Sequence, residues 1–549
     1  MKPGRTGAMS GALYDVPGAG CEQAPAAPLH LARMPRRKES SRQGRNVLVW
    51  FRRDLRTSDQ TALHFASLDA QARGGAVIGV HVLCPQEIRD HDEAGVKIDL
   101  RLRTLRALTD DLAALGIPLV HAVVPRRAQI ASELARIAEE GGCAALHFNR
   151  EYEVNERARD EAVTERLAAR GVAVRSYHDH YVIGPGDADD RPPGANGGGV
   201  RKPDGAAYTV FTPFQKRWVA MVAERGFEVL PRPRRQEAAL PKCPRSETTI
   251  PQRIAGCESH VSAAAAAELW PAGEKAAHKR LSRFIEEHLA QYHEARDMPA
   301  IDGVSRLSPY LNCGAISPRQ CLRSALDAGG GDLGALMSGK GGSSGAAKWI
   351  GELIWREFYA HVAYHFPRVC MHRAFKVATD RIAWRDDEGD FERWCAGETG
   401  FPIVDAGMRQ LRETGWMHNR VRMITAMFLA KDLFIDWRRG EQFFMRHLID
   451  GDLASNNGGW QWAAGTGTDA APYFRIFNPT SQGRRFDPDG SYVRRYVPEL
   501  RAVDASAIHA PYEARSPESR RAVNYPKPMV DRSRARERVI RAFKGVRQG

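Results

Sequence analysis

Cysteine is scarce in this chain, with nine residues among 549, and none of the nine belongs to a Cys-x-x-Cys pair. Structural zinc sites and disulfide frameworks need cysteines that are closely paired or present at high density. The histidine-containing strings also lack the spacing of metal ligands. The sequence therefore predicts neither a metal centre nor a disulfide framework, and it favours a reducing compartment, the cytoplasm.

Long apolar runs are also absent. No run reaches the roughly 18–20 residues that a membrane-spanning helix needs, so no membrane segment is expected. Residues 1–45 are rich in Gly, Ala, Pro, Ser and Arg, and no apolar stretch of the secretory type follows their basic residues. We expect a disordered basic extension there, with Met34 as a candidate translation start.

Acidic residues are outnumbered, because 80 Lys and Arg face 66 Asp and Glu, a net charge of +14. Residues 1–45 and the basic C-terminal tail, residues 529–549, each carry +5, which leaves +4 for residues 46–528. Positive charge favours an anionic partner but does not determine a fold. Net charge is therefore a weak pointer to nucleic acid.

A Gly-x-Gly-x-x-Gly turn is missing after the first predicted strand, which argues against an ordinary dinucleotide-binding domain. Short apolar runs nevertheless alternate with helical patterns between residues 46 and 183. This alternation predicts a doubly wound parallel α/β domain. The expected strands span residues 46–51, 76–83, 117–124, 144–148 and 172–177. Ligands of such sheets bind at the carboxyl ends of the strands.

Residues 184–260 are rich in Pro, Gly and Arg and are expected to link two domains, with residues 208–218 packed on a domain surface. Helical patterns prevail from residue 261 to residue 528, and this helical domain holds most of the tryptophans. The fold class is therefore α/β followed by all-α.

Two patterns in the helical half indicate chemistry. Glu352, Trp355 and Tyr359 fall on one helical face, and the alternative reading is a surface ion pair between Glu352 and Arg356. Residues 449–479 concentrate Asp and Asn before two glycines, which suits a loop around a polar planar ligand. The alternative for this second pattern is a capped helix start.

These segments together resemble the photolyase/cryptochrome family, and most of all its bacterial class I cyclobutane pyrimidine dimer photolyases. The resemblance is carried, in order from about residue 46 to residue 525, by NVLVWFRRDLRTSDQTAL, YEVNERARD, YHEARDMPAIDGVSRLSPYLNCGAISPRQCL, ELIWREFYAH, GWMHNRVRMITAMFLAKDLFIDWR and DGDLASNNGGWQWAAGTGTDAAPYFRIFNP. It implies an N-terminal antenna domain and a C-terminal domain that holds FAD. The single His418 before Asn419 departs from (6-4) photolyases, which carry a histidine pair near this place.

The resemblance also implies a set of flavin-binding residues. They are Tyr292, Val304, Ser305, Arg306, Leu307, Ser308, Trp349, Arg422, Asp450, Gly451 and Asp452. The family usually has Thr where this chain has Val304, so one hydroxyl contact to phosphate is missing. Asn456 matches the residue that faces flavin N5, where plant cryptochromes typically carry Asp, and this favours repair over signalling.

Catalytic and DNA-contacting roles follow from the same resemblance. Trp384, Trp437 and Trp460 match the family's electron-transfer triad, and Glu352, Asn419, Met423 and Asn456 match catalytic positions. Candidate contacts to the flipped-out dimer and its DNA are Arg296, Glu352, Trp355, Arg356, Tyr359, Asn419, Arg420, Trp462 and Arg475. Two indoles and a thioether suit an unstacked pyrimidine pair, and arginines suit the flanking phosphates.

An antenna chromophore is implied as well. Asn155 and Glu156 match residues that hold methenyltetrahydrofolate, with His91 and Cys370 as neighbours. Met371 stands where related enzymes often have Lys, so a deazaflavin or an empty site are alternatives.

The expected activity is light-dependent repair of pyrimidine dimers in DNA by electron transfer from excited FADH⁻, performed by a monomer that does not bind membranes. The alternatives are a blue-light photoreceptor and a flavin-containing DNA-binding protein without catalysis.

Overall fold

The computed structural model describes residues 44–186, 198–238, 249–339, 341–513 and 524–548. The expected extension, residues 1–45, and the candidate start Met34 fall almost wholly outside the described residues. No helix among the described residues is long and apolar enough to cross a membrane.

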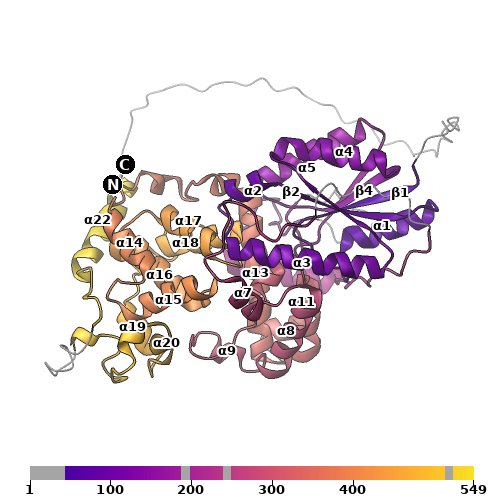
Figure 1. Ribbon diagram of the computed structural model, residues 1–549. Helices are drawn as coiled ribbons and strands as arrows, with labels where there is room; N and C mark the ends of the chain where they lie inside the picture. The colour runs from indigo at the N-terminus through magenta and orange to yellow at the C-terminus, as the bar shows by residue number, and fades with distance from the viewer. Residues whose placement is uncertain (1–43, 187–197, 239–248, 340, 514–523, 549) are drawn as a thin grey trace, which may run out of the picture. The chain divides into compact units, whose positions relative to one another are not determined.

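Five parallel strands form the sheet of the first half, in the order β3-β2-β1-β4-β5 (Figure 1). The strands are β1 Asn46–Phe51, β2 Val77–Leu83, β3 Leu119–Val123, β4 Cys143–Asn149 and β5 Ala173–Tyr177. The connecting helices are α1 Thr61–Ala72, α2 Pro85–Asp90, α3 Gly95–Ala114, η1 Arg127–Gln129, α4 Ile130–Glu140 and α5 Val154–Ala168. The doubly wound α/β prediction is confirmed.

Apolar side chains cover both faces of this sheet. Leu134 of α4 and Leu167 of α5 pack in one buried cluster, whereas Leu63 of α1 and Leu105 of α3 pack in another. All seven residues of β2 are buried. A strand enclosed on both faces reads as a continuous apolar run, which is why VIGVHVL was recognisable in the sequence.

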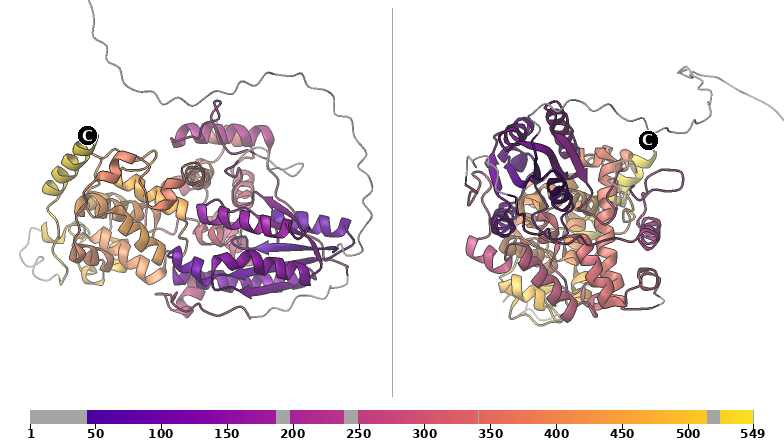
Figure 2. Two further views of the ribbon diagram at one scale, coloured as in Figure 1. Left: turned by 90° about the horizontal axis from the view of Figure 1, so that it is seen from above. Right: turned by 90° about the vertical axis from the view of Figure 1, so that its right-hand side faces the viewer.

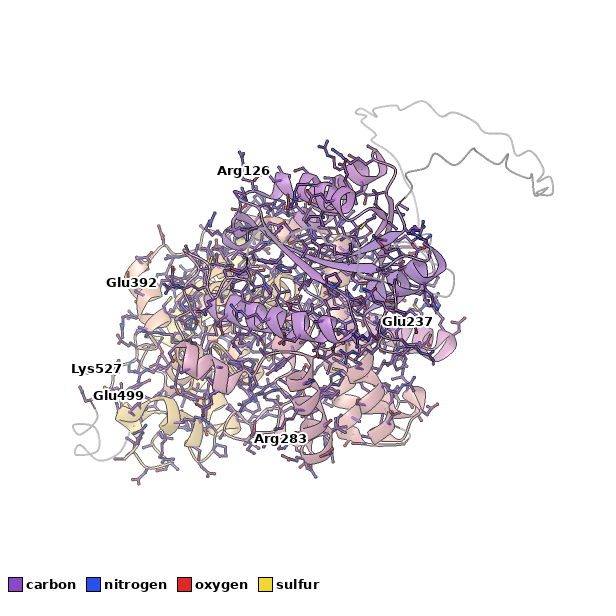
Figure 3. The ribbon with its side chains drawn as sticks, turned by 45° about the vertical axis from the view of Figure 1, so that its right-hand side comes forward. Arg126, Glu237, Arg283, Glu392, Glu499 and Lys527 are labelled. Carbon is purple, nitrogen blue, oxygen red and sulfur yellow. The ribbon has the colours of Figure 1, made fainter. Side chains whose placement is uncertain are left out.

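The second half is helical, also as predicted. Its elements before residue 400 are α7 Ala263–Leu269, α8 Glu274–Glu287, α9 Tyr292–Ala295, α10 Ser308–Cys313, α11 Pro318–Gly329, α12 Leu333–Met337, α13 Ser344–His365, η2 Pro367–Met371, η3 Val377–Arg381 and α14 Glu388–Ala396. Those after it are α15 Pro402–Thr414, α16 Asn419–Met427, the π-helical η4 Phe428–Leu433, α17 Trp437–His447, α18 Leu453–Ala464, α19 Pro479–Phe486, α20 Ser491–Tyr496, η5 Pro498–Leu500, η6 Pro511–Glu513 and α22 Arg532–Gln548. Charged side chains such as Arg126 and Glu499 lie on the outside (Figure 3).

The connection between the halves contains a helix that the sequence analysis did not predict. Helix α6, Phe211–Arg225, buries Phe214 and Trp218 completely. The Trp218 indole N–H donates to the buried Glu357 carboxylate of α13 at 2.6 Å. The segment is therefore part of the core, because its aromatic side chains bury more area than a surface-packed linker would.

The C-terminal segment also differs from a simple basic tail. Helix α22 buries Val539 and Phe543 against Ile382 and Phe434. Figure 2 shows this helix in yellow beside the orange helices of the second half. Arg534, Arg536 and Arg541 are exposed while Val539 and Phe543 pack, and net charge alone could not indicate this apolar stripe.

A buried ionic network joins the carboxyl end of the sheet to α11. Arg319 donates to Asp59 at 3.0 Å and to Asp179 at 2.8 Å, and Arg56 pairs with Asp179 at 2.5 Å. Both carboxylates are fully buried. Burial alone would raise the pKa of Asp179, but Arg56 and Arg319 outweigh this effect and lower it. The network therefore keeps its charges and fixes the strand ends against the helical half.

Candidate functional site

A central cavity of about 520 Å3 lies within the helical half. All of the residues expected to bind flavin line it, namely Tyr292, Val304, Ser305, Arg306, Leu307, Ser308, Trp349, Arg422, Asp450, Gly451 and Asp452. So do Arg296, Glu352, Trp355, Arg356, Tyr359, Asn419, Met423, Asn456, Trp460 and Trp462. Arg420, Arg475, Trp384 and Trp437 are not among the lining residues. The predicted flavin-binding residues and most of the predicted dimer-binding residues therefore line the same cavity.

Residues around Asp452 form a capped helix start, so the expectation of a ligand-wrapping loop at Asn456 and Asn457 is wrong. The Asp452 side chain accepts the Ser455 backbone N–H at 2.9 Å, and α18 begins at Leu453. Asn457 donates to the Glu441 carboxylate at 2.8 Å, so it braces α17 instead of lining the cavity. A helix N-terminus accommodates Asp and Asn well because their oxygens satisfy free N–H groups.

The side-chain amide of Asn456 is oriented by a hydrogen bond to the backbone of α17. Its Nδ2 donates to the Glu441 carbonyl oxygen at 2.9 Å. The side-chain oxygen Oδ1 of Asn456 is therefore free to meet a ligand in the cavity that this residue lines. An acceptor at this place suits a ligand N–H.

An arginine–aspartate pair lies beside the cavity. Arg422 pairs with Asp450 at 2.9 Å, and the Ser308 hydroxyl donates to the same carboxylate oxygen at 2.6 Å. The other oxygen of Asp450 is buried and has no partner among the described residues. A buried acceptor without a partner is costly, so this oxygen fits a ligand hydroxyl or N–H. This acceptor therefore suits FAD, which carries both hydroxyl and N–H groups.

Glu352 is held by an arginine, but not by the one named in the sequence alternative. Arg296 of the α9 turn makes a short ion pair with Glu352. Arg356 instead donates to the His180 carbonyl oxygen at 2.6 Å, and its guanidinium lies 4.5 Å from the Tyr181 ring centroid. Arg356 is thus tied to the end of the α/β half while it lines the cavity.

An aromatic slot borders Glu352. The ring centroids of Trp355 and Tyr359 lie 5.5 Å apart. A Cβ at Gly458 would lie 2.1 Å from the Tyr359 ring, so only glycine lets α18 approach α13 this closely. Met423 and Trp462 line the same cavity. The slot is apolar with Glu352 and Asn419 at its border, as expected for a heterocycle with polar edges.

Arg420 and Arg475 lie outside the cavity. Arg420 pairs with Asp297 at 2.7 Å and contacts the Met423 sulfur at 3.8 Å. Arg475 is exposed, and its carbonyl oxygen accepts from buried Lys431 at 2.9 Å. Burial lowers the pKa of Lys431 to about 7. The two arginines can therefore contact a long anionic ligand only at the rim.

The three predicted electron-transfer tryptophans share a property that the sequence cannot show. The indole N–H groups of Trp384, Trp437 and Trp460 are buried without an acceptor among the described residues. In contrast, the indole N–H groups of Trp218, Trp270 and Trp394 donate to Glu357, Thr414 and Thr425. Trp50 of β1 also has an indole N–H without an acceptor among the described residues, so this property does not by itself mark the three electron-transfer candidates.

Trp394 is a neighbour that the sequence reasoning did not single out. Its ring centroid lies 6.0 Å from that of Trp460, and its side chain is fully buried. The only signal in the sequence was the high density of tryptophan in this half, and that density does not show which tryptophans contact each other.

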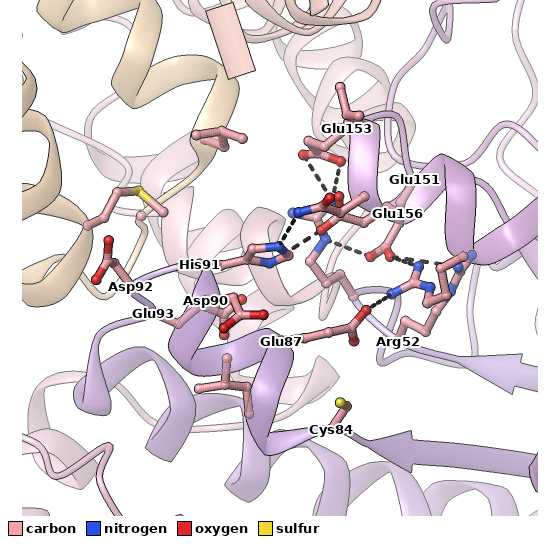
Figure 4. Close-up of a pocket in the computed structure, with 18 of the residues that line it drawn as sticks. Arg52, Cys84, Glu87, Asp90, His91, Asp92, Glu93, Glu151, Glu153 and Glu156 are labelled. Carbon is pink, nitrogen blue, oxygen red and sulfur yellow. Dashed lines mark hydrogen bonds and ion pairs between the residues drawn. The ribbon is translucent and has the colours of Figure 1, made fainter. Parts of the chain in front are cut away.

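A second cavity of about 350 Å3 lies at the carboxyl end of the sheet (Figure 4). The four expected antenna residues, His91, Asn155, Glu156 and Cys370, all line it. His91 lies 3.1 Å from the Asn155 amide and 3.5 Å from the Glu156 carboxylate. Met371 also lines this cavity and is 61% exposed, so it lies at the rim. Because methionine is neutral, this position carries no charge.

Acidic residues crowd this second cavity. Burial, and then the charges of Glu153 and Glu151, raise the pKa of Glu156 to about 8. Arg53 binds both neighbours, at 2.7 Å to Glu151 and 3.0 Å to Glu153. The raised pKa favours the neutral carboxyl of Glu156, which can both donate and accept a hydrogen bond. Among the described residues no group of three or more His, Cys, Asp or Glu side chains could hold a metal ion.

Comparisons with known proteins agree with this geometry. Residues 47–234 match the family model described as DNA photolyase, and residues 349–545 match the FAD binding domain of DNA photolyase. The deoxyribodipyrimidine photo-lyase of Escherichia coli strain K12 is 40% identical over 510 residues, covering 91% of this chain and 99% of that protein.

Solved structures are similar over nearly the whole chain. A bacterial class III photolyase from Agrobacterium tumefaciens has a TM-score of 0.76 and 35% identity, covering 94% of this chain and 100% of its own. A cryptochrome from Synechocystis sp. PCC6803 has a TM-score of 0.72 and 26% identity, covering 90% of this chain and 99% of its own.

Proposed function

Because the chain belongs to the DNA photolyase family, we propose that it is a deoxyribodipyrimidine photo-lyase, an enzyme that repairs cyclobutane pyrimidine dimers in DNA with light. One observation carries the proposal most directly. Glu352, Trp355, Asn419, Met423 and Trp462 border the same cavity as the residues suited to flavin.

FAD bound in the central cavity supplies the light-absorbing electron donor. Tyr292 and the backbone of residues 304–308 hold its phosphates, with Ser305 in place of the hydroxyl that Val304 lacks. The Arg422–Asp450 pair, 2.9 Å apart, stabilises negative charge on the flavin ring. The Asn456 carbonyl oxygen accepts an N–H, because its amide nitrogen is already bound to Glu441.

The dimer enters the slot after it is flipped out of the duplex. Trp355, Trp462 and Met423 replace the lost base stacking, which contributes roughly 1–3 kcal/mol per base on an aromatic ring. Glu352 and Asn419 meet the polar edges of the two bases. Arg296, Arg420 and Arg475 contact the flanking phosphates and orient the strand.

The tryptophan triad has a separate role. Trp460 lines the cavity, Trp437 is fully buried, and Trp384 is half-buried, so the three can carry an electron from the protein exterior inward.

We also propose that the second cavity holds a folate antenna, 5,10-methenyltetrahydrofolate. Neutral Glu156 and Asn155 offer paired donors and acceptors for a pteridine edge. Residues 46–183 form the antenna domain and residues 261–528 the catalytic domain, and we expect a cytoplasmic monomer. A deazaflavin or an empty site is the alternative, because Met371 stands where related enzymes often carry a cation.

A single experiment tests the main proposal. The full-length protein with reduced FAD is incubated with an oligonucleotide that contains one thymine dimer, under near-UV or blue light and in the dark. We expect the dimer to disappear only in the light. A photoreceptor without repair activity would respond to light without consuming dimers, and that outcome would overturn the assignment.

A further inference from the structure

A short segment before α6 reaches the α18 side of the central cavity. We call residues 208–211 the strap. The Thr209 carbonyl oxygen accepts from the Thr468 hydroxyl at 2.5 Å, and the Phe211 backbone N–H donates to the Asp469 carboxylate at 3.1 Å. The strap belongs to the connection between the two halves, yet it is bonded to the loop that follows α18.

Phe211 lies flat against Trp355. The two ring centroids are 3.6 Å apart and the planes differ by 5°. Phe358 closes the arrangement edge-on, at 5.8 Å from Phe211 and 5.6 Å from Trp355. Trp355 lines the central cavity, whereas Phe211 and Phe358 do not. Phe211 is 8% exposed.

Because Phe211 covers one face of the Trp355 indole, a base can stack only on the other face. The contact also removes rotational freedom from the indole before any ligand arrives. An unsupported indole would lose that freedom on binding, and this loss would weaken the affinity for the base.

Asp469 is held in an unusual backbone conformation. Its φ is 44°, in the left-handed region that residues other than glycine seldom adopt. Such a strained conformation is retained where surrounding contacts fix it. Here the carboxylate caps the first turn of α6, which the helix dipole favours. The strained residue thus fastens the strap.

We propose that Phe211 is a positioning residue for the dimer slot, and that the strap holds Trp355 in the plane that the flipped-out base requires. This inference rests on the proposed function, since it assigns the Trp355 face to a pyrimidine. Phe211 acts through Trp355 and does not contact the base.

A double-mutant cycle tests the inference. The FAD-containing full-length protein is titrated in the dark with oligonucleotides that carry a thymine dimer or none, using the wild type, F211A, W355A and the double variant. We expect F211A to weaken dimer binding about 3–10-fold and to leave binding to undamaged DNA unchanged. In the W355A background the same change should have no further effect, because the two rings act as one unit.

Three further variants keep the result interpretable. F211Y retains the flat ring and should restore wild-type discrimination, and F211L, which fills the volume without a flat face, should not. F214L, in the same helix but without a contact to Trp355, should lower thermal stability without changing discrimination. Flavin absorbance is recorded for each variant to establish that the central cavity is intact.

The outcomes separate this inference from the proposed function. If the wild type does not distinguish dimer from undamaged DNA, the proposed function fails. If the wild type does, but F211A and F211L bind the dimer as tightly as wild type, Phe211 is only core. An equal loss in the W355A background would likewise overturn the positioning role.

Discussion

At the scale of a single residue, Glu352 is held by a partner side chain before any ligand binds. Its carboxylate is 31% exposed and is paired with Arg296, which is itself 12% exposed. Burial opposes the charge of Arg296, but Glu352 raises the pKa of that guanidinium, so Arg296 stays charged. A base edge that enters the slot therefore meets an acceptor that is already oriented.

Replacing Glu352 tests this role. We expect Glu352→Ala to weaken dimer binding about 10-fold or more, since a hydrogen bond to a charged group contributes roughly 1.5–3 kcal/mol. The repair quantum yield should also fall, while the flavin content stays unchanged. Titration and dimer counting after illumination measure both. Exposed Glu286→Ala on α8 is the control, and an unchanged yield would make Glu352 a structural acid.

Trp384 separates activation from repair. Trp384→Phe should slow light-driven reduction of oxidised flavin by about 10-fold or more, because phenylalanine is much harder to oxidise than indole. Repair by protein that is reduced beforehand should be unaffected, since Trp384 lies outside the central cavity. Transient absorption follows the first process and dimer loss the second. A repair defect in the pre-reduced variant would contradict the assignment.

Glu357 predicts a pH dependence of stability. Burial raises its pKa to about 7, against the donated hydrogen bonds of Trp218, Val182 and Ile183 that favour the charged form. The folded state thus binds the proton more tightly than the unfolded state, whose pKa is near the usual 4.5. The contribution of Glu357 to stability is therefore fully present below pH 4.5 and is lost as the pH rises to about 7.

Glu357→Gln removes this titration. The amide resembles the protonated acid, so the variant and the wild type should have similar stability at pH 5. Between pH 5 and pH 8 the wild type should lose about 1–3 kcal/mol relative to the variant, because only the wild type must bury a charge. Urea unfolding at both pH values measures it, with Glu286→Gln as the exposed control. A difference that does not change with pH would show that Glu357 does not titrate in this range.

At the scale of elements, α22 joins the core beside the outer end of the triad. Its residues Val539 and Phe543 belong to a cluster that Trp384 also contacts. Arg532 of α22 pairs with buried Asp432 of the π-helix at 3.0 Å. The helix therefore covers one side of Trp384.

Phe543→Ala should loosen this cover. We expect a loss of about 2–4 kcal/mol in stability, since truncating a buried phenylalanine costs about 3–5 kcal/mol in a closed core and less near a chain end. Iodide should quench Trp384 fluorescence more strongly in the variant, when measured against a Trp384→Phe background. Arg541→Ala, on the exposed side of the same helix, should change neither quantity.

At the scale of the whole molecule, the ionic network of Arg56, Asp59, Asp179 and Arg319 connects the sheet to the helical half. Removing one partner leaves an unpaired charge in a buried place, which typically costs about 3–5 kcal/mol. The network thus makes the two halves depend on each other for stability.

Arg319→Met is expected to destabilise the protein by about this amount, 3–5 kcal/mol. Chemical denaturation measures the loss, and Arg323→Met, exposed one turn further along α11, is the control. Separate unfolding transitions for the two halves would support the coupling. An equal stability of Arg319→Met and Arg323→Met would exclude it.

The sequence by itself determined the order of strands and helices and most residues of the cavity. Strands buried on both faces read as apolar runs, and helices show a 3.6-residue repeat, so both patterns are local. The flavin and dimer residues lie in continuous motifs, for example residues 449–479. Motifs of this kind keep their spacing whatever packs around them.

Only the tertiary structure decided which partners these residues have. Glu352 pairs with Arg296, 56 positions away, and not with Arg356 four positions along the helix. Phe211 reaches Trp355 from a segment that the sequence analysis expected to pack on a domain surface, with no partner indicated. The unpaired N–H groups of the triad are equally invisible to pattern reading. Such contacts depend on how distant segments bury each other, and no local periodicity records that.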